Sequence, residues 1–182
     1  MKLINENIPD KLKSALYKLI EEDNYLLKCD LNERTICHKL AVYLEGQYCD
    51  LDVDVEYNRA LDNVKDLDKE DFINNLVEVY KESEQHSEKD VKELLKEEIK
   101  EGSKKRVLPD IIVHQRGNEF EKNRVVIEIK KSNNLSNVAA DEVKLKMYKE
   151  ELHYSEAYFI VIKVDSDFSE DESKQNYCVF KV

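Results

Sequence analysis

Two short apolar runs, both rich in β-branched residues, limit the possible folds of this chain more than any other feature. They cover residues 107–114 and 124–129, and the stretch 115–118 between them contains Gly and Asn. β-Branched residues favour strands, whereas Gly and Asn favour a reversal of the chain. The pattern predicts an antiparallel hairpin around which the other elements pack.

Two helices are predicted before this hairpin. Residues 9–22 carry apolar side chains at steps of three and four, which is the spacing of one helical face. A second helix begins after Asp30 or Asn32, both of which are good N-terminal caps, and ends at Gly46. Glu33 therefore lies in the first turn of the second helix.

A strand and a charged insertion follow these two helices. Residues 51–58 alternate strictly between apolar and polar side chains, which predicts a half-buried strand. Residues 61–105 are rich in Glu, Lys and Asp, and the spacing of their apolar residues marks helices around 72–80 and 91–99. We expect this stretch to be a helical insertion whose charged residues mostly face solvent.

A further helix and two strands are predicted after the hairpin. Asn137 is placed to cap the helix, and apolar runs at 157–164 and 177–182 predict the strands. Runs of strands divided by one helix favour a mixed sheet flanked by helices over a helical bundle. We therefore predict a single α/β domain over residues 1–182.

The charge balance restricts the partners of the chain. Its 29 Lys and Arg residues and 40 Asp and Glu residues give a formal net charge of −11, which opposes long-range attraction to a polyanion. A nucleic acid would have to meet local basic groups, such as Lys130 and Lys131, together with a bound metal ion. The sequence shows no signal peptide and no apolar stretch of about 20 residues, so we expect a cytoplasmic protein that binds no membrane.

Charged residues on the two hairpin strands indicate a metal site. Residues two apart on a strand share a face, so Glu128 and Lys130 project together while Ile129 enters the opposite face. Pairing of the strands around the turn brings Asp110 close to Glu128 at one end of the sheet. Two carboxylates with a main-chain carbonyl and water suit Mg²⁺. The adjacent lysine can stabilise charge on a phosphate or help to activate water.

The residues Leu-Pro-Asp at 108–110, followed by Glu128-x-Lys130 on the next strand, resemble the motif of the PD-(D/E)XK, or restriction-endonuclease-like, superfamily. The resemblance implies an αβββαβ core with a central mixed sheet flanked by helices and a helical insertion between the first and second strands. It also implies a Mg²⁺- or Mn²⁺-dependent nuclease in which Lys130 assists catalysis. The metal ligands implied are Glu33, Asp110, Glu128 and the carbonyl of Ile129.

The same resemblance indicates residues that contact a nucleic acid, with DNA as the expected substrate. Lys144 lies on the helix that packs beside the site in this superfamily, and Lys131 follows the motif and is placed to contact a backbone phosphate. Three roles are open for His114 and Arg116, which lie near the end of the first hairpin strand. They contact a phosphate, they hold Glu33 in position, or they are turn residues without a functional role. Many members of the superfamily act as dimers, so a homodimer or a partner protein is an expected assembly.

Two other interpretations stay open at the level of sequence. In the first, Glu128 and Lys130 form an exposed ion pair on an edge strand, and Asp110 caps a turn. In the second, the chain has the nuclease fold but is a binding or assembly module with little catalysis, which the net charge of −11 favours. The sequence contains no nucleophile elbow, P-loop or dinucleotide-binding turn, which argues against serine hydrolase, ATP-driven and dinucleotide chemistry.

Overall fold

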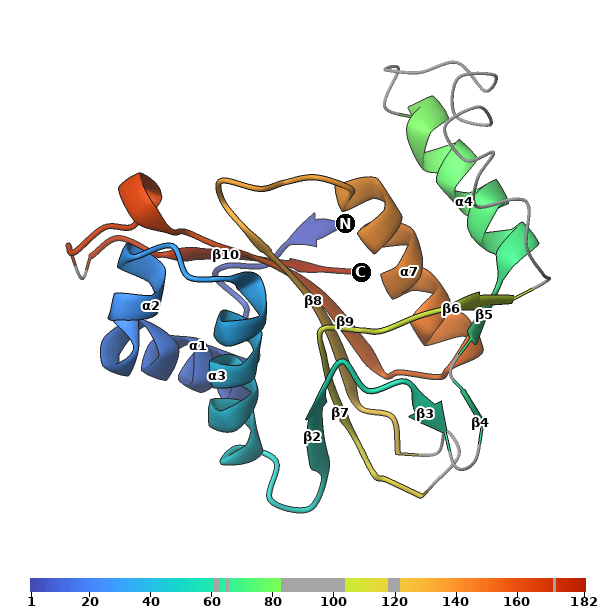
Figure 1. Cartoon of the computed structure of the whole chain (residues 1–182), viewed down its shortest axis with the longest axis horizontal. Coiled ribbons are helices and arrows are strands. Elements are labelled where there is room, and N and C mark those ends of the chain that lie inside the picture. The colour runs from blue at the N-terminus through green and yellow to red at the C-terminus, as the bar shows by residue number, and fades with distance from the viewer. Residues whose placement is uncertain (61–62, 65, 83–103, 118–121, 172) are drawn as a thin grey trace.

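A six-stranded mixed sheet with helices on both faces forms the centre of the molecule (Figure 1). The computed structural model describes residues 1–60, 63–64, 66–82, 104–117, 122–171 and 173–182. The arrangement confirms the predicted α/β class with a central mixed sheet flanked by helices.

The order of strands across the sheet is β1-β10-β9-β8-β7-β2. Strands β8 and β9 run parallel, whereas the other neighbouring pairs are antiparallel. The predicted hairpin is therefore β7–β8, and β8 lies inside the sheet. A parallel pair requires a crossover connection, which helix α7 provides here (Figure 1). The strands are β1 (Lys2–Leu3), β2 (Asp52–Val55), β7 (Ile111–His114), β8 (Val125–Lys131), β9 (Glu156–Ile162) and β10 (Tyr177–Lys181).

Helices cover the two faces of the sheet separately. One face carries α1 (Asp10–Glu22), α2 (Asn24–Lys28) and α3 (Glu33–Glu45), and the other carries α7 (Val138–Glu151) with α4 (Lys69–Glu82) packed against it (Figure 1). None of the helices formed by the described residues is both long and apolar enough to cross a bilayer.

The ends of the helices test the predicted caps. Helix α3 begins at Glu33 because the side chain of Asn32 accepts a hydrogen bond from the main-chain N–H of Thr35 at 2.8 Å. Helix α7 begins directly after Asn137, as predicted. The backbone of Asn137 is left-handed, with φ 61°, and its side chain makes no capping hydrogen bond. Its contribution is therefore a change of chain direction rather than a side-chain cap.

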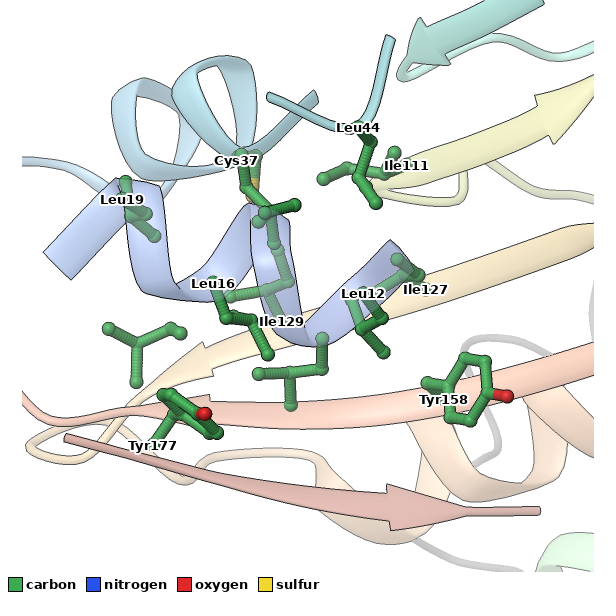
Figure 2. Packing of buried hydrophobic residues seen from close by; sticks show 14 of the residues in the cluster. Leu12, Leu16, Leu19, Cys37, Leu44, Ile111, Ile127, Ile129, Tyr158 and Tyr177 are labelled. Carbon is green, nitrogen blue, oxygen red and sulfur yellow. The ribbon is translucent and has the colours of Figure 1, made fainter. Parts of the chain in front are cut away.

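Strand β8 divides the core into two apolar clusters. Ile127 and Ile129 pack with Leu16 and other residues of α1 and α3 on one face (Figure 2). Val126 packs with Tyr148 and the other apolar residues of α4 and α7 on the opposite face. This is the alternation predicted from the two-residue period of a strand. The parity of Glu128 places it with Val126, on the α7 face.

The segment after β2 departs from the predicted strand at Glu56. The strand ends at Val55, and Glu56 has a left-handed backbone with φ 51°. Val55 packs against the α1–α3 cluster, whereas Tyr57 packs against the α4–α7 cluster. The prediction that the alternation continues to residue 58 is therefore wrong, because the backbone of Glu56 moves the next apolar side chain to the other face.

The insertion is helical in part. Helix α4 matches the helix expected around 72–80, and the helix expected at 91–99 lies outside the described residues. Short strand pairs that the sequence does not predict flank α4: β3 (Arg59–Ala60) with β4 (Asn63–Val64), and β5 (Asp66–Asp68) with β6 (Lys104–Arg106). Elements of two to five residues show too few positions for a period to be recognised, which also explains why β1 and α2 were not predicted.

The left-handed backbone of Glu56 leads to a prediction about stability. An L side chain disfavours this conformation because its Cβ crowds the following carbonyl, and Gly does not. The ion pair between Glu56 Oε1 and Arg34 Nε, at 2.8 Å, is lost in both Glu56→Gly and Glu56→Ala. We expect Glu56→Gly to be about 1 kcal/mol more stable than Glu56→Ala in urea unfolding followed by circular dichroism. Equal unfolding free energies for the two variants would contradict the assignment of strain.

Candidate functional site

The carboxylate of Glu128 is buried in the middle of the sheet. Glu128 is 2% exposed, and its Oε1 atom accepts contacts from two groups of α7, Lys144 Nζ at 3.3 Å and the Tyr148 hydroxyl at 3.4 Å. A buried carboxylate without such partners is costly. The interpretation of Glu128 as half of an exposed ion pair on an edge strand is therefore wrong.

Asp110 lies immediately before β7 and is tied to β8. Because Ile111 pairs with Ile127 in the antiparallel register, one further step places Asp110 opposite Glu128. The Oδ2 atom of Asp110 accepts a hydrogen bond from the main-chain N–H of Ile129 at 2.7 Å. Asp110 is therefore held by the neighbouring strand and does not simply cap a turn.

Lys130 links β8 to the helices on both sides of the sheet. Its Nζ atom lies 3.6 Å from Glu33 Oε1, in the first turn of α3, and 3.4 Å from Asp141 Oδ2, in the first turn of α7. The predicted proximity of Glu33 and Lys130 is thus present. Glu33 reaches this position because the capped start of α3 lies at the same end of the sheet as Lys130.

Five charged side chains form a row of alternating sign, which we call the charged row: Glu33, Lys130, Asp141, Lys144 and Glu128. The closest contact in the row joins Lys144 Nζ to Asp141 Oδ1 at 2.6 Å. Asp141 is 3% exposed. Within the part of the chain that the structure describes, its Oδ2 atom is buried and accepts no hydrogen bond, since its contact with Lys130 is an ion pair only.

Burial and nearby negative charges raise the pKa values of the two sheet carboxyl groups, Glu128 and Asp110. Burial is the main cause that raises the pKa of Glu128 to about 8, and Asp110 and Asp141 raise it further while Lys144 lowers it. Burial also raises the pKa of Asp110 to about 6, although the Ile129 N–H lowers it. Burial opposes the charge of Lys144, but Glu128 and Asp141 still raise the pKa of Lys144 to about 12.

The donor set suits a hard divalent cation in its chemistry, but the carboxylates are not gathered around one point. The charged row and Asp110 together contain four carboxylates and two ammonium groups, which leaves a net charge of −2 when all are ionised. Carboxylate oxygens are the ligands that Mg²⁺ prefers, and the buried Oδ2 atom of Asp141 accepts no hydrogen bond. No group of three His, Cys, Asp or Glu side chains among the described residues is close enough to hold a metal ion. The ammonium groups of Lys130 and Lys144 lie between carboxylates of the charged row.

The residues predicted to contact a substrate lie in three different places. Lys144 belongs to the charged row. Lys131 lies on the α2–α3 side of the sheet, where its Nζ atom contacts Asp30 Oδ1 at 2.8 Å. His114 and Arg116 lie at the far end of β7 from Asp110, where both contact Asp54.

The interpretation of Arg116 as a partner of Glu33 is wrong. Arg116 Nε donates to Asp54 Oδ2 at 2.8 Å, and its Nη2 atom pairs with the other oxygen of the same carboxylate. His114 Nε2 lies 2.9 Å from Asp54 Oδ2, and its ring packs against Tyr57 with centroids 5.0 Å apart. The contact of His114 and Arg116 with a substrate stays a prediction.

Asp141 and Tyr148 join the site although no motif marks either of them. With Lys144 they stand at spacings of three and seven residues, which places all three on one stripe of α7. The signal present in the sequence is this stripe of polar side chains beside the buried apolar residues of the helix, such as Val143 and Leu145. It becomes meaningful only once the stripe is known to face Glu128.

No family model, no curated protein and no solved structure matches this chain. Any functional assignment therefore depends on the residues and contacts described above.

The raised pKa of Glu128 predicts how stability depends on pH without a divalent cation. The pKa rises from an ordinary 4.5 to about 8 in the folded state, so the folded chain binds more protons than the unfolded chain between these values. Stability is then greatest below pH 4.5 for this group and falls as the pH rises to 8, by at most ~1.4 kcal/mol per pH unit. In urea unfolding with EDTA, we expect Glu128→Gln to flatten this fall.

The window from pH 6 to 8 is the most informative, because Asp110, with a pKa of about 6, contributes a fall of the same sign at lower pH. Glu150→Gln is the matched control, since Glu150 is an exposed glutamate of the same helix that carries Lys144. A wild-type slope in Glu128→Gln would contradict the raised pKa of the buried Glu128 carboxyl.

Proposed function

We propose that this chain is a metal-dependent phosphodiesterase of the nuclease type, with Mg²⁺ or Mn²⁺ as cofactor and DNA as the expected substrate. The observation that carries the proposal is that three carboxylates and one lysine lie around β8, where the buried Glu128 stands opposite Asp110 and Lys130 contacts Glu33. Asp110, Glu128 and Lys130 come from two neighbouring strands, and Glu33 comes from the start of α3. Buried charges of this kind with perturbed pKa values are typical of functional sites.

The order of elements around the site supports a restriction-endonuclease-like core as part of the proposal. Helix α3 precedes the antiparallel strands β2, β7 and β8, and α7 then leads to β9, which is parallel to β8. This order fits the αβββαβ core that the sequence motif implies. The insertion containing α4 enters between the first and second of these strands.

Each residue of the proposed site has a separate task. A divalent cation bound by Asp110, Glu128 and Glu33 would polarise the scissile phosphate and lower the pKa of the attacking water. Asp110 is oriented for ligation by its hydrogen bond from the Ile129 N–H, and the carbonyl of Ile129 is the proposed main-chain ligand. Lys130 would stabilise the charge that develops on the phosphate oxygens. Glu33 and Asp141 restrict its ammonium group to the site.

The negative net charge of the chain sets a condition on substrate binding. A polyanion approaching a protein of charge −11 is repelled at long range. Lys144 and Lys131 lie on either face of β8 close to the site, and both are engaged by carboxylates, Asp141 and Asp30 respectively. Contact with phosphates would therefore require these ion pairs to open, which favours a weakly bound substrate.

A plasmid-nicking assay with Mn²⁺ tests the proposal. We expect the wild-type chain to convert supercoiled plasmid to open circles, and both Asp110→Asn and Lys130→Gln to lose activity by on the order of 10²-fold or more. Asp110→Asn removes the charge but keeps an oxygen that can accept from the Ile129 N–H. Gel quantification against time measures the rates, and circular dichroism checks that the variants fold.

Lys146→Gln is the matched control for this assay. It removes an ammonium group from α7 that is partly exposed and pairs with Glu142 instead of the site. We expect it to cleave at the wild-type rate. Equal rates for the wild type, Asp110→Asn and Lys130→Gln would refute the proposed catalytic roles.

A second candidate function is a binding or assembly module with the same fold. The specific observation in its favour is that lysines separate the carboxylates of the charged row, so that no three acidic groups of the described residues gather around one point. This candidate predicts no cleavage with Mn²⁺. It also predicts that the wild type and Asp110→Asn bind a partner or a nucleic acid equally well in gel-shift experiments.

A further inference from the structure

Lys144 occupies the space between two carboxylates that a cation would otherwise approach. Its Nζ atom lies 3.3 Å from Glu128 Oε1 and 2.6 Å from Asp141 Oδ1. The side chains of both acids are almost fully buried, 3% and 4% exposed, and that of Lys144 is 21% exposed. The side chain of Lys144 is therefore more exposed than the acids that it bridges.

The two contacts of Lys144 are unequal. The ion pair with Asp141, at 2.6 Å, is the shorter contact and has the larger Coulomb attraction, whereas the contact with Glu128, at 3.3 Å, is a long hydrogen bond. Lys144 and Asp141 are also three residues apart on α7, which keeps them neighbours on the helix surface. Lys144 can therefore release Glu128 and still keep its partner on the helix.

Asp141 has spare capacity to hold the released lysine. Within the described residues its Oδ2 atom is buried and accepts no hydrogen bond, although Lys130 Nζ lies 3.4 Å away. A carboxylate can accept several hydrogen bonds, and an ammonium group carries three donors. An ammonium group that turns from Glu128 towards Asp141 thus gains a partner for the one it loses.

We propose that Lys144 is an internal competitor of the divalent cation at Glu128, and that Asp141 is the positioning residue that holds Lys144 when the cation enters. This inference rests on the proposed function. The cation would replace the ammonium group beside Glu128, and Lys144 would remain bound to Asp141. The site would then bind the divalent cation only at concentrations high enough to displace the ammonium group of Lys144 from Glu128.

The proposal predicts opposite effects for two neighbouring substitutions. Lys144→Gln removes the competitor, and a doubly charged ion gains more from the loss of a nearby positive charge than a single proton on Glu128 does. Asp141→Asn weakens the hold on Lys144, which then stays with Glu128. We expect Lys144→Gln to bind Mn²⁺ about tenfold more tightly than the wild type, and Asp141→Asn to bind it more weakly.

The double variant, Asp141→Asn with Lys144→Gln, distinguishes competition by Lys144 from a purely electrostatic effect of Asp141 on the cation. Charge alone predicts that Asp141→Asn weakens Mn²⁺ binding by the same factor whether or not Lys144 is present, because independent effects add. Competition predicts that most of the effect of Asp141→Asn disappears in the Lys144→Gln background. The measurement is a titration of the full chain with Mn²⁺ alone, in which electron paramagnetic resonance counts the free ion.

The outcomes are distinct for the inference and for the proposed function. Lys144→Met, which keeps the length of the side chain without its charge, replaces Lys144→Gln if that variant does not fold. Two results would overturn the inference and leave the proposed function unaffected. In the first, the wild type binds Mn²⁺ and the Lys144 variants bind it equally tightly. In the second, Asp141→Asn has the same effect on Mn²⁺ binding in both backgrounds. Mn²⁺ binding by Lys144→Gln but not by the wild type supports the inference. Absence of binding by both overturns the two together.

Discussion

The burial of one carboxylate in a central strand is the constraint on which the rest of the site depends. Glu128 is buried and shares its face of the sheet with the buried apolar residues Val126 and Phe159, and desolvation disfavours its charged form. Helix α7 supplies the compensation through Lys144 and Tyr148. Because Lys144 is shared with Asp141, and Asp141 with Lys130, the charge of Glu128 is connected across the sheet to α3.

A buried row of charges such as this one is not needed to make the fold stable. Bringing charged groups out of water costs several kcal/mol for each ion, and well-packed apolar residues in their place are often at least as stable. The two apolar clusters on either side of β8 already hold the helices against the sheet. Places where a chain breaks the rules of core packing are expected to be functional, which supports the proposed role of the row.

Much of the fold and part of the site can be predicted from local patterns. The spacing of apolar residues marks α1, α3 and α4, and the period of two places Ile127 and Ile129 opposite Glu128. The cap at Asn32 positions Glu33. The pairings of Arg116 with Asp54 and of Lys131 with Asp30 were not predictable, because each partner lies 62 or 101 residues away along the chain.

The sequence by itself determined the directions of side chains within each element, because the geometry of a strand or helix repeats every 2 or about 3.6 residues. It thereby determined that Glu128 and Lys130 share a face and that Asp110 lies near the start of the neighbouring strand. Only the tertiary structure decided which charges meet. The crossing of α7 over β8 brings Lys144 to Glu128 and Asp141 to Lys130, and the left-handed backbone of Glu56 turns Tyr57 to the other face. These outcomes depend on how elements pack in space, which no local repeat encodes.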